Sequence, residues 1–184
     1  MSKVILGLAG EISSGKGTVA KYIVEKHNGS THRFSTVLRD VLGRIYLEES
    51  RDNMQKTSTM LRTTFRDDIL SLVVSRDVEK DDHEIVAVDG VRRLPDIEHL
   101  KKIPGFKLVY IDTDLKNSYD RIITRGENPD DKEKTFEQFQ KDHEKEAELQ
   151  IRGLKDHADY VVDNNGSFED LYKQVDEIID KSRG

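Results

Sequence analysis

Short apolar runs alternate along the chain with longer segments in which apolar residues recur every three or four positions. A continuous apolar run is typical of a strand covered on both faces, and the three-to-four spacing is typical of an amphipathic helix. Strands are predicted at 4–9, 84–89, 106–112 and 159–163, with a weaker one at 32–34. Helices are predicted at 16–26, 36–48, 52–78, 94–102, 115–125, 135–156 and from 167 onward. Strands that alternate with helices predict an α/β domain whose mainly parallel sheet has helices on both faces.

Two of the predicted helices are long. In the segment 52–78 an apolar stripe that includes Leu61, Phe65 and Ile69 keeps a period of about 3.6 residues. The second long helix opens with the pair Thr135 and Gln138, which have the spacing of a capping box, and its charged sequence continues to about residue 156.

The composition narrows the function classes. With 184 residues, of which 35% are hydrophobic and 36% charged, the chain is expected to form one domain with a heavily charged surface. The net charge of −6 gives no electrostatic case for binding a nucleic acid or an anionic membrane. The absence of cysteine excludes disulfides and thiolate metal sites. Because the apolar runs are too short for a signal peptide or a membrane span, we expect a soluble, cytoplasmic protein. We expect it to be a monomer or a small homo-oligomer.

A glycine-bracketed loop follows the first predicted strand. Gly10, Gly15 and Lys16 have the spacing of a phosphate-binding loop, and a predicted helix follows them. Glycines let successive backbone N–H groups point inward, the helix N-terminus adds partial positive charge, and Lys16 is expected to reach the β- and γ-phosphates of ATP. The alternative is an ordinary strand–turn–helix with a chance lysine. The predicted ATP-binding residues of the loop are Gly10, Ser13, Ser14, Gly15, Lys16, Gly17 and Thr18.

The end of this loop departs from the general motif. Gly17 occupies the position where a serine or threonine usually follows the lysine, and Thr18 comes one residue later. The ending Gly-Lys-Gly-Thr resembles that of adenylate kinase and related nucleoside monophosphate kinases. The resemblance implies that Thr18 contacts phosphate and that Mg²⁺ is held largely through water, and direct metal ligation by Thr18 stays open.

A second segment with candidate phosphate-binding residues begins at the end of the strand at 84–89. Asp89 is expected at the carboxyl end of that strand, where ligands bind in an open parallel sheet and where a carboxylate could orient the Mg²⁺ shell through water. Asp89-Gly90-Val91-Arg92-Arg93 is similar to the Asp-Gly-x-Pro-Arg segment of nucleoside monophosphate kinases, whose arginine binds the acceptor phosphate. Either Arg92 or Arg93 could take that role, or both could be solvated surface charges.

The segment 34–42 is similar to the start of the acceptor-binding region in the same kinases. Thr36 and Arg39 match the threonine and arginine that contact the acceptor nucleotide there, or Ser35 caps a helix and Arg39 is exposed. Arg62 and Arg66 share one helix face, and we expect them to pair with nearby acidic residues such as Asp67 rather than to line a cleft.

Arginines also precede a charged segment that we expect to form a lid over about 126–150. Arg121 and Arg125 share a helix face, and Arg152 lies at the far end of the segment. A mobile lid excludes water, and a guanidinium group stabilises charge that develops on a transferring phosphoryl group. Arg125 is the predicted catalytic clamp and Arg152 is the second candidate. The alternative is a solvent-exposed charged helix, and this is the favoured interpretation for Lys132 to Lys145, whereas a functional role is favoured for Arg125.

The last strand and its loop, within 157–178, resemble the C-terminal segment of dephospho-coenzyme A kinases, where this loop lies near the adenine of ATP. Asn164, Asn165 and Gly166 match that loop, and Asn165 and Gly166 are the predicted ATP contacts. An Asn-Asn-Gly-Ser turn is also common in proteins that bind no nucleotide.

Together these segments resemble the nucleotide-kinase branch of P-loop proteins. The resemblance implies a three-layer P-loop fold with a five-stranded, mainly parallel sheet, a helical acceptor-binding insert at about 35–80 and the lid. It also implies an ATP-dependent phosphotransferase that uses Mg²⁺, with Lys16, Asp89 and Arg125 as catalytic residues.

The acceptor is expected to be a nucleotide-like small molecule, most simply a nucleoside monophosphate. A phosphate acceptor is already ionised and needs arginines rather than a base, whereas the hydroxyl of dephospho-coenzyme A would need a carboxylate such as Asp40. A regulatory P-loop NTPase that transfers no phosphate is the third hypothesis. The donor base, ATP or GTP, is left open.

Overall fold

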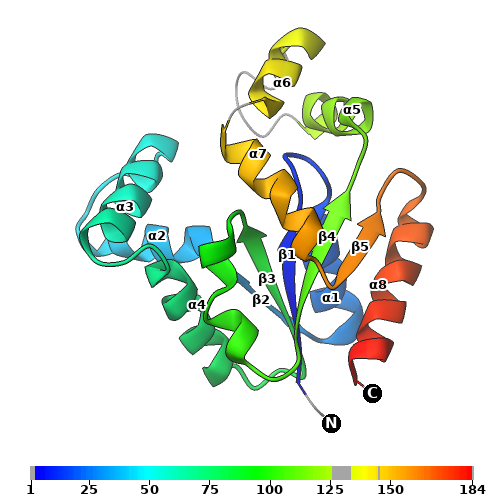
Figure 1. The fold of residues 1–184 in the computed structure, drawn as a ribbon, viewed down its shortest axis with the longest axis horizontal. Coiled ribbons are helices and arrows are strands. Elements are labelled where there is room, and N and C mark those ends of the chain that lie inside the picture. The colour runs from blue at the N-terminus through cyan, green and yellow to red at the C-terminus, as the bar shows by residue number, and fades with distance from the viewer. Residues whose placement is uncertain (1–2, 126–133, 145, 184) are drawn as a thin grey trace.

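The computed structural model describes residues 3–125, 134–144 and 146–183 (Figure 1). Its centre is a parallel sheet with the strand order β2-β3-β1-β4-β5. The strands are β1 (Val4–Ala9), β2 (Ser30–Arg33), β3 (Ile85–Val91), β4 (Phe106–Asp112) and β5 (Tyr160–Asp163). The expected five-stranded parallel sheet is confirmed, and β1, which is buried along its whole length, lies in the middle of it.

Two helices cover one face of the sheet. They are α1 (Lys16–His27) and α8 (Phe168–Arg183), whose apolar residues pack on alternate residues of the central strands such as Leu6, Leu8 and Val109. The residues between these positions, such as Ile5 and Leu108, point to the other face, where they pack with residues of α4 and with Ile151 and Leu154. Because successive strand residues point to opposite faces, one continuous apolar run supplies both cores.

The helices between β2 and β3 form one end of the molecule (Figure 1). They are α2 (Phe34–Arg44), α3 (Arg51–Thr64) and α4 (Ile69–Lys80). The prediction of one helix over 52–78 was wrong, because the chain turns between α3 and α4 and leaves Phe65 largely exposed. A side chain from the last turn of α3 holds this turn: Arg62 donates a 2.8 Å hydrogen bond to the carbonyl oxygen of Asp67, five residues along the chain.

The other helical segments are also more divided than their periodicity predicts. The segment 94–102 forms two short 3₁₀ turns, η1 (Leu94–Ile97) and η2 (Leu100–Lys102), and α5 (Leu115–Arg125) has the predicted bounds. The predicted helix over 135–156 is instead α6 (Phe136–His143), α7 (Glu146–Gly153) and the 3₁₀ turn η4 (Leu154–His157). Phe139 and His143 pack near Tyr119 and Glu11, whereas Ile151 and Leu154 pack onto the sheet. The two halves of the segment therefore pack against different parts of the molecule.

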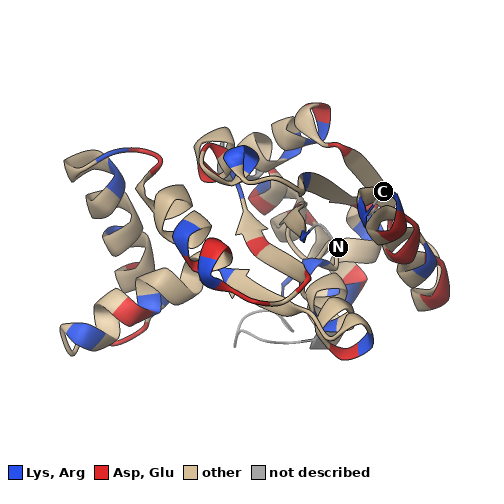
Figure 2. Cartoon of the chain, turned by 90° about the horizontal axis from the view of Figure 1, so that it is seen from below, with Lys and Arg blue, Asp and Glu red and all other residues tan. Residues whose placement is uncertain are grey.

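Side chains of both charge signs are interspersed over the outer helices (Figure 2). Many of them form exposed pairs one helical turn apart, such as Lys21 with Glu25 and Lys56 with Asp52. Among the described residues, no helix is both long enough and apolar enough to cross a membrane.

Candidate functional site

The loop between β1 and α1 has a backbone that side chains would obstruct. Gly10 and Gly15 have φ values of 149° and 104°, in the region that favours glycine. A Cβ at Gly10 would lie 2.6 Å from the carbonyl oxygen of Ile111, and one at Gly15 would lie 2.2 Å from Asn164 Nδ2. Ser13 also has a positive φ, of 59°. The glycines of the motif are therefore required by the curl of the loop and by the close approach of a neighbouring strand.

Lys16 begins α1 and lies across this loop. Its Nζ donates hydrogen bonds to the carbonyl oxygens of Gly10, at 2.6 Å, and Glu11, at 2.9 Å, and it lies 3.5 Å from Ser14 Oγ. These contacts fix a positive charge at the N-terminus of α1, where the helix already favours an anion.

Ser14 is held from outside the loop by two other connections. Its carbonyl oxygen accepts hydrogen bonds from Asn164 Nδ2, at 2.7 Å, and from Thr113 Oγ1, at 3.0 Å. Asn164 is in turn held by Arg121, which donates a 2.7 Å hydrogen bond to the carbonyl oxygen of Asn164. The loops after β4 and β5 thus brace the phosphate-binding loop.

Asn165 and Gly166, the residues predicted to contact ATP in this segment, lie farther out. Both are exposed, and the Asn165 side chain accepts hydrogen bonds from the Asp114 N–H and from Asn117 Nδ2. Asn165 therefore ties the loop after β5 to the start of α5, and its contact with ATP stays a prediction. The adjacent Asn164, which is buried, is the residue that reaches the loop.

Ser13 Oγ and Arg121 NH1 are buried and have no hydrogen-bond partner among the described residues. Burial lowers the pKa of the Arg121 guanidinium, because its charged form is desolvated. Leaving such donors unpaired is costly, and the phosphate oxygens of a nucleotide are acceptors that would satisfy them. The glycine-lined curl, Lys16 and these donors are therefore a fitting donor set for a triphosphate.

Asp89 lies at the carboxyl end of β3, beside the strand that leads into the loop. It pairs in register with Leu8 of β1, and the register shifts at the next residue of β1, which pairs with Val91. Gly90 is the residue skipped, with a φ of 94°. The Asp89 carboxylate is 17% exposed and lies 3.4 Å from Nε of Arg33, at the end of β2. The parallel sheet thus brings Asp89 and the phosphate-binding loop to the same edge, as expected.

The chemistry of this edge fits Mg²⁺ in one particular way. The described residues contain no cluster of three or more acidic or histidine side chains that could hold a metal ion. The two predicted ligands, Asp89 and Thr18, are too few for an all-protein site. They suit Mg²⁺, which usually keeps several waters and takes further ligands from substrate phosphates.

The predicted acceptor residues of α2 lie on its exposed side. Thr36, Arg39 and Asp40 are all exposed. Arg39 donates a 3.1 Å hydrogen bond to Ser35 Oγ and lies 3.4 Å from the Glu49 carboxylate. The described contacts of Arg39 are therefore local, and its role toward an acceptor stays a prediction.

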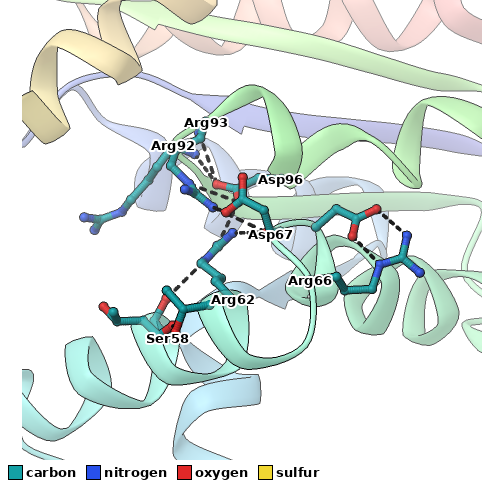
Figure 3. A network of polar contacts seen from close by, with 10 residues as sticks. Ser58, Arg62, Arg66, Asp67, Arg92, Arg93 and Asp96 are labelled. Atoms are coloured by element: carbon teal, nitrogen blue, oxygen red, sulfur yellow. Dashed lines mark hydrogen bonds and ion pairs between the residues drawn. The ribbon is translucent and has the colours of Figure 1, made fainter.

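Arg92 and Arg93 face different surroundings. Arg93 NH2 donates to Asp67 Oδ1 at 2.8 Å, whereas the side chain of Arg92 is exposed and extends away from this network (Figure 3). The backbone N–H groups of both residues donate to one buried carboxylate, Asp96 Oδ2, at 3.0 and 3.1 Å. Of the two arginines, Arg92 is the one left exposed beside the end of β3.

Arg62 and Arg66 pair with carboxylates, as predicted, but with different partners from those expected. Arg62 NH2 donates to Asp96 Oδ1 at 2.8 Å, and both side chains are largely buried (Figure 3). Arg66 pairs with Asp68, and Asp68 also contacts His99 Nε2 at 2.8 Å. These contacts hold the pKa of the Asp68 carboxyl well below its usual range, with the Arg66 hydrogen bond as the largest cause. The network joins α3 to the segment after β3.

The structure describes the side chain of only one of the two predicted lid arginines, Arg125 and Arg152. Arg125 ends α5, and its side chain lies outside the described residues. Arg152 of α7 contacts the phosphate-binding loop: its NH2 and Nε donate to Glu11 Oε1 at 2.6 and 3.1 Å. His143 Nδ1 of α6 lies 3.3 Å from the same oxygen. Burial acts to raise the pKa of Glu11, but the hydrogen bonds with His143 and Arg152 outweigh it and lower the pKa below 4.5.

Three contacts at this site escaped prediction. The first is the contact of Glu11 with Arg152, because the motif allows any residue at the position of Glu11. The second is the contact of Arg33 with Asp89, because Arg33 lies on a strand with a weak apolar pattern. The third is the contact of Asn164 with Ser14, which spans 150 residues. The tail resemblance was the one sequence signal that pointed to Asn164.

The fold and the loop agree with the comparisons made with known proteins. The family described as "AAA domain" matches residues 7–140, which include the phosphate-binding loop, Asp89 and both arginines after it. The chain belongs to this AAA domain family. Among the relatives of this AAA domain chain, a UPF0200 protein of Saccharolobus islandicus is 29% identical over 183 residues, covering 97% of this chain and 93% of that protein. A UPF0200 protein of Methanocaldococcus jannaschii is 28% identical over 178 residues, which cover 96% of this chain and 89% of that protein.

Solved structures share the fold of this AAA domain chain. TT1252 from Thermus thermophilus superposes with a TM-score of 0.64 at 15% identity, covering 98% of both chains. A shikimate kinase from Acinetobacter baumannii in complex with shikimate gives a TM-score of 0.57 at 16% identity, covering 97% of this chain and 92% of that one. The expected P-loop kinase fold is thereby confirmed. At these identities the likeness concerns the fold and leaves the substrate undetermined.

Proposed function

We propose that this protein is an ATP-dependent phosphotransferase that moves the γ-phosphate of ATP to a nucleotide-like small molecule. The observation that carries the proposal is the position of Lys16, whose ammonium group is held between the carbonyl oxygens of Gly10 and Glu11 in a glycine-shaped loop. Asp89 at the neighbouring strand end, and the P-loop kinase fold shared with shikimate kinases, support a kinase among the P-loop proteins.

Binding and orientation fall to the loop. Its backbone N–H groups and the Ser13 and Thr18 hydroxyls bind the phosphates of ATP, and Lys16 neutralises charge on the β- and γ-phosphates. Mg²⁺ bound with ATP would supply further charge neutralisation, with Asp89, through water, and Thr18 as the residues that would hold it. Asn165 and Gly166 are proposed to lie toward the adenine.

The transfer itself makes one bond and breaks one. An oxygen of the acceptor attacks the γ-phosphorus, and the bond from that phosphorus to the β–γ bridging oxygen breaks, so that ADP leaves. Arginine side chains stabilise the charge that develops on the transferring group. We propose Arg125 as the residue in that role, within a lid over about 126–150.

A nucleoside monophosphate is the acceptor class that we propose. Its phosphate arrives ionised, so the site needs cations and no base. Arg92 supports this proposal, because it is exposed beside the end of β3 while Arg62 and Arg93 are engaged with carboxylates. Thr36 and Arg39, within the helical insert at about 35–80, are proposed as further acceptor contacts.

A hydroxyl acceptor such as dephospho-coenzyme A is the second candidate. The contact of Asn164 with the phosphate-binding loop favours it, because that residue belongs to the segment that resembles dephospho-coenzyme A kinases. A hydroxyl must lose a proton on transfer, and Asp40 is the proposed base.

The test measures ADP release from Mg-ATP by purified protein with each ribo- and deoxynucleoside monophosphate, with dephospho-coenzyme A, with shikimate and with no acceptor. We expect one nucleoside monophosphate to raise the rate at least about 100-fold over the rate without acceptor, which is the size of effect that positioning a reactant produces. Stimulation by dephospho-coenzyme A or shikimate would instead establish a hydroxyl acceptor. A slow release that no acceptor changes would overturn the kinase proposal in favour of a regulatory NTPase.

A further inference from the structure

Glu11 contacts both the lysine of the phosphate-binding loop and the helices that follow α5. Its backbone carbonyl oxygen accepts a hydrogen bond from Lys16 Nζ at 2.9 Å. Its side-chain Oε1 accepts two hydrogen bonds from Arg152, from NH2 at 2.6 Å and from Nε at 3.1 Å. One residue therefore joins the cation of the loop to a guanidinium of α7.

The His143 side of this contact is enclosed. His143 is buried, its ring packs against Phe139 with ring centroids 4.5 Å apart, and its Nδ1 lies 3.3 Å from Glu11 Oε1. The other ring nitrogen, Nε2, is buried and has no hydrogen-bond partner among the described residues. The Glu11 carboxylate itself is 18% exposed, and the side chain of Arg152 is 50% exposed. A partly buried carboxylate with partners from two helices is better defined than an ion pair in which both side chains are exposed, which contributes little.

Arg152 is held on its helix as well. Ile151, which precedes Arg152, and Leu154, two residues after it, are buried in the core that contains Ile5 and Leu108 of the sheet. Packing thus anchors the C-terminal end of α7, and the contact of Arg152 with Glu11 ties this end of the helix to the phosphate-binding loop. Because Arg carries a planar fork of donors, the pair of bonds to one carboxylate oxygen fixes the orientation of the group as well as its distance.

A carboxylate next to a phosphate-binding loop is otherwise unfavourable, because it repels the phosphates that the loop would bind. The Arg152 guanidinium compensates for that charge. The acidic residue therefore has a role in the loop, because it brings the positive charge of Arg152 on α7 to the loop.

We infer that Glu11 is a positioning residue, which holds Arg152 of α7 and His143 of α6 against the phosphate-binding loop so that Arg152 lies beside the transferring phosphate. This inference rests on the proposed phosphotransfer. It differs from the assignment of Arg125, which acts from the end of α5, and it makes the second residue of the loop a determinant of turnover.

The test compares Glu11→Gln, Arg152→Ala and the double variant with the wild-type protein. Glu11→Gln keeps the size of the side chain and removes its charge, so we expect kcat to fall about 10- to 100-fold while KM for ATP does not rise, the range that a misplaced group produces. Arg152→Ala should lose a similar factor. The double variant should lose no more than the larger single loss, because both changes remove the same contact.

Glu137→Gln is the matched control, since Glu137 is an exposed glutamate on α6 that undergoes the same chemical change. Its kcat and KM should equal those of the wild type. Full activity of Glu11→Gln, or losses that multiply in the double variant, would overturn the inference.

A second measurement separates this inference from the proposed function. Amide hydrogen exchange in the segment 146–153 of the protein without nucleotide should rise in Glu11→Gln and stay unchanged in Glu137→Gln. If the wild-type protein transfers phosphate to no acceptor, the proposed function fails, and the kcat and KM comparison is then made on its slow ATP hydrolysis. Unchanged exchange in Glu11→Gln would show that the contact does not hold α7, and the inference would fail whatever the acceptor is.

Discussion

Asn164 Nδ2 donates a 2.7 Å hydrogen bond to the carbonyl oxygen of Ser14, across a sequence separation of 150 residues. Through this bond the loop after β5 supports the phosphate-binding loop after β1, with β4 between the two strands in the sheet. The same amide nitrogen lies where a side chain on Gly15 would begin. The shape of the loop is therefore fixed jointly by its own glycines and by a distant asparagine.

Gly15→Ala tests this joint constraint. The new Cβ would lie 2.2 Å from Asn164 Nδ2, at a residue whose φ is 104°, so we expect a loss of about 1 to 3 kcal/mol in the free energy of unfolding, together with weakened ATP binding. Gly17→Ala is the control, because a Cβ there meets nothing within 4 Å and the residue lies within α1. Its stability should stay within about 0.5 kcal/mol of the wild type or rise slightly. Urea denaturation measures both, and equal effects of the two variants would contradict the expectation.

Lys16→Ala should remove ATP binding and turnover while the fold persists. The ammonium group of Lys16 contacts Gly10, Glu11 and Ser14 within the loop, so we expect the loss to fall on phosphate binding rather than on the core. We expect turnover to drop by at least about 100-fold, since a charge aimed at the phosphates is lost. Lys21→Ala, an exposed lysine on the same helix, should match the wild type. Calorimetric titration with ATP and circular dichroism check the two halves of this prediction. Retained activity in Lys16→Ala would refute the assignment of the loop.

Arg62→Ala distinguishes a structural arginine from a substrate ligand. Its partner Asp96 is 2% exposed, so removing Arg62 leaves a buried carboxylate with fewer donors. We expect a loss of about 2 to 4 kcal/mol in the free energy of unfolding. Arg76→Ala, which breaks an exposed pair with Glu79, should cost less than about 1 kcal/mol. If Arg62→Ala kept its stability and raised KM for the acceptor alone, Arg62 would be a substrate ligand instead.

Asp81 should make stability depend on pH in the acid range. Burial acts to raise the pKa of its carboxyl, but hydrogen bonds from Ser30, His83 and His32 outweigh burial and hold the pKa well below 3.8. A depressed folded-state pKa contributes stability above the unfolded value, and that contribution is lost as the pH falls through the folded-state pKa. Asp81→Asn should therefore destabilise the protein by about 1 to 3 kcal/mol at pH 7. Its difference from the wild type should shrink below about pH 3.8.

Asp82→Asn is the control for this pH series, because Asp82 is exposed and adjacent in sequence. Thermal unfolding of the three proteins between pH 2 and 7 gives the comparison. A difference between Asp81→Asn and the wild type that stays constant over this range would contradict the proposed origin of the pKa shift.

The sequence by itself determined the sheet and the phosphate-binding loop. Each central strand is a continuous apolar run buried on both faces, and the positive φ values of the loop call for glycines, so both features could be recognised before their distant partners were known. The helices were predicted less well where they end. Nothing in the local pattern of 52–78 marks the turn near Phe65, because Arg62 and Asp67 stabilise it through a side-chain contact that periodicity does not encode.

Only the tertiary structure decided which charged residues face one another. The sequence could name Arg62 and Arg93 as candidates, but their partners Asp96 and Asp67 lie 34 and 26 residues away and meet them only in the folded chain. The same holds for Glu11, whose partners come from helices more than 130 residues away. Arg66, by contrast, pairs with Asp68, two residues along the chain. Backbone conformation follows from neighbouring residues, whereas the pairing of long, flexible side chains depends on elements that meet only after the chain has folded.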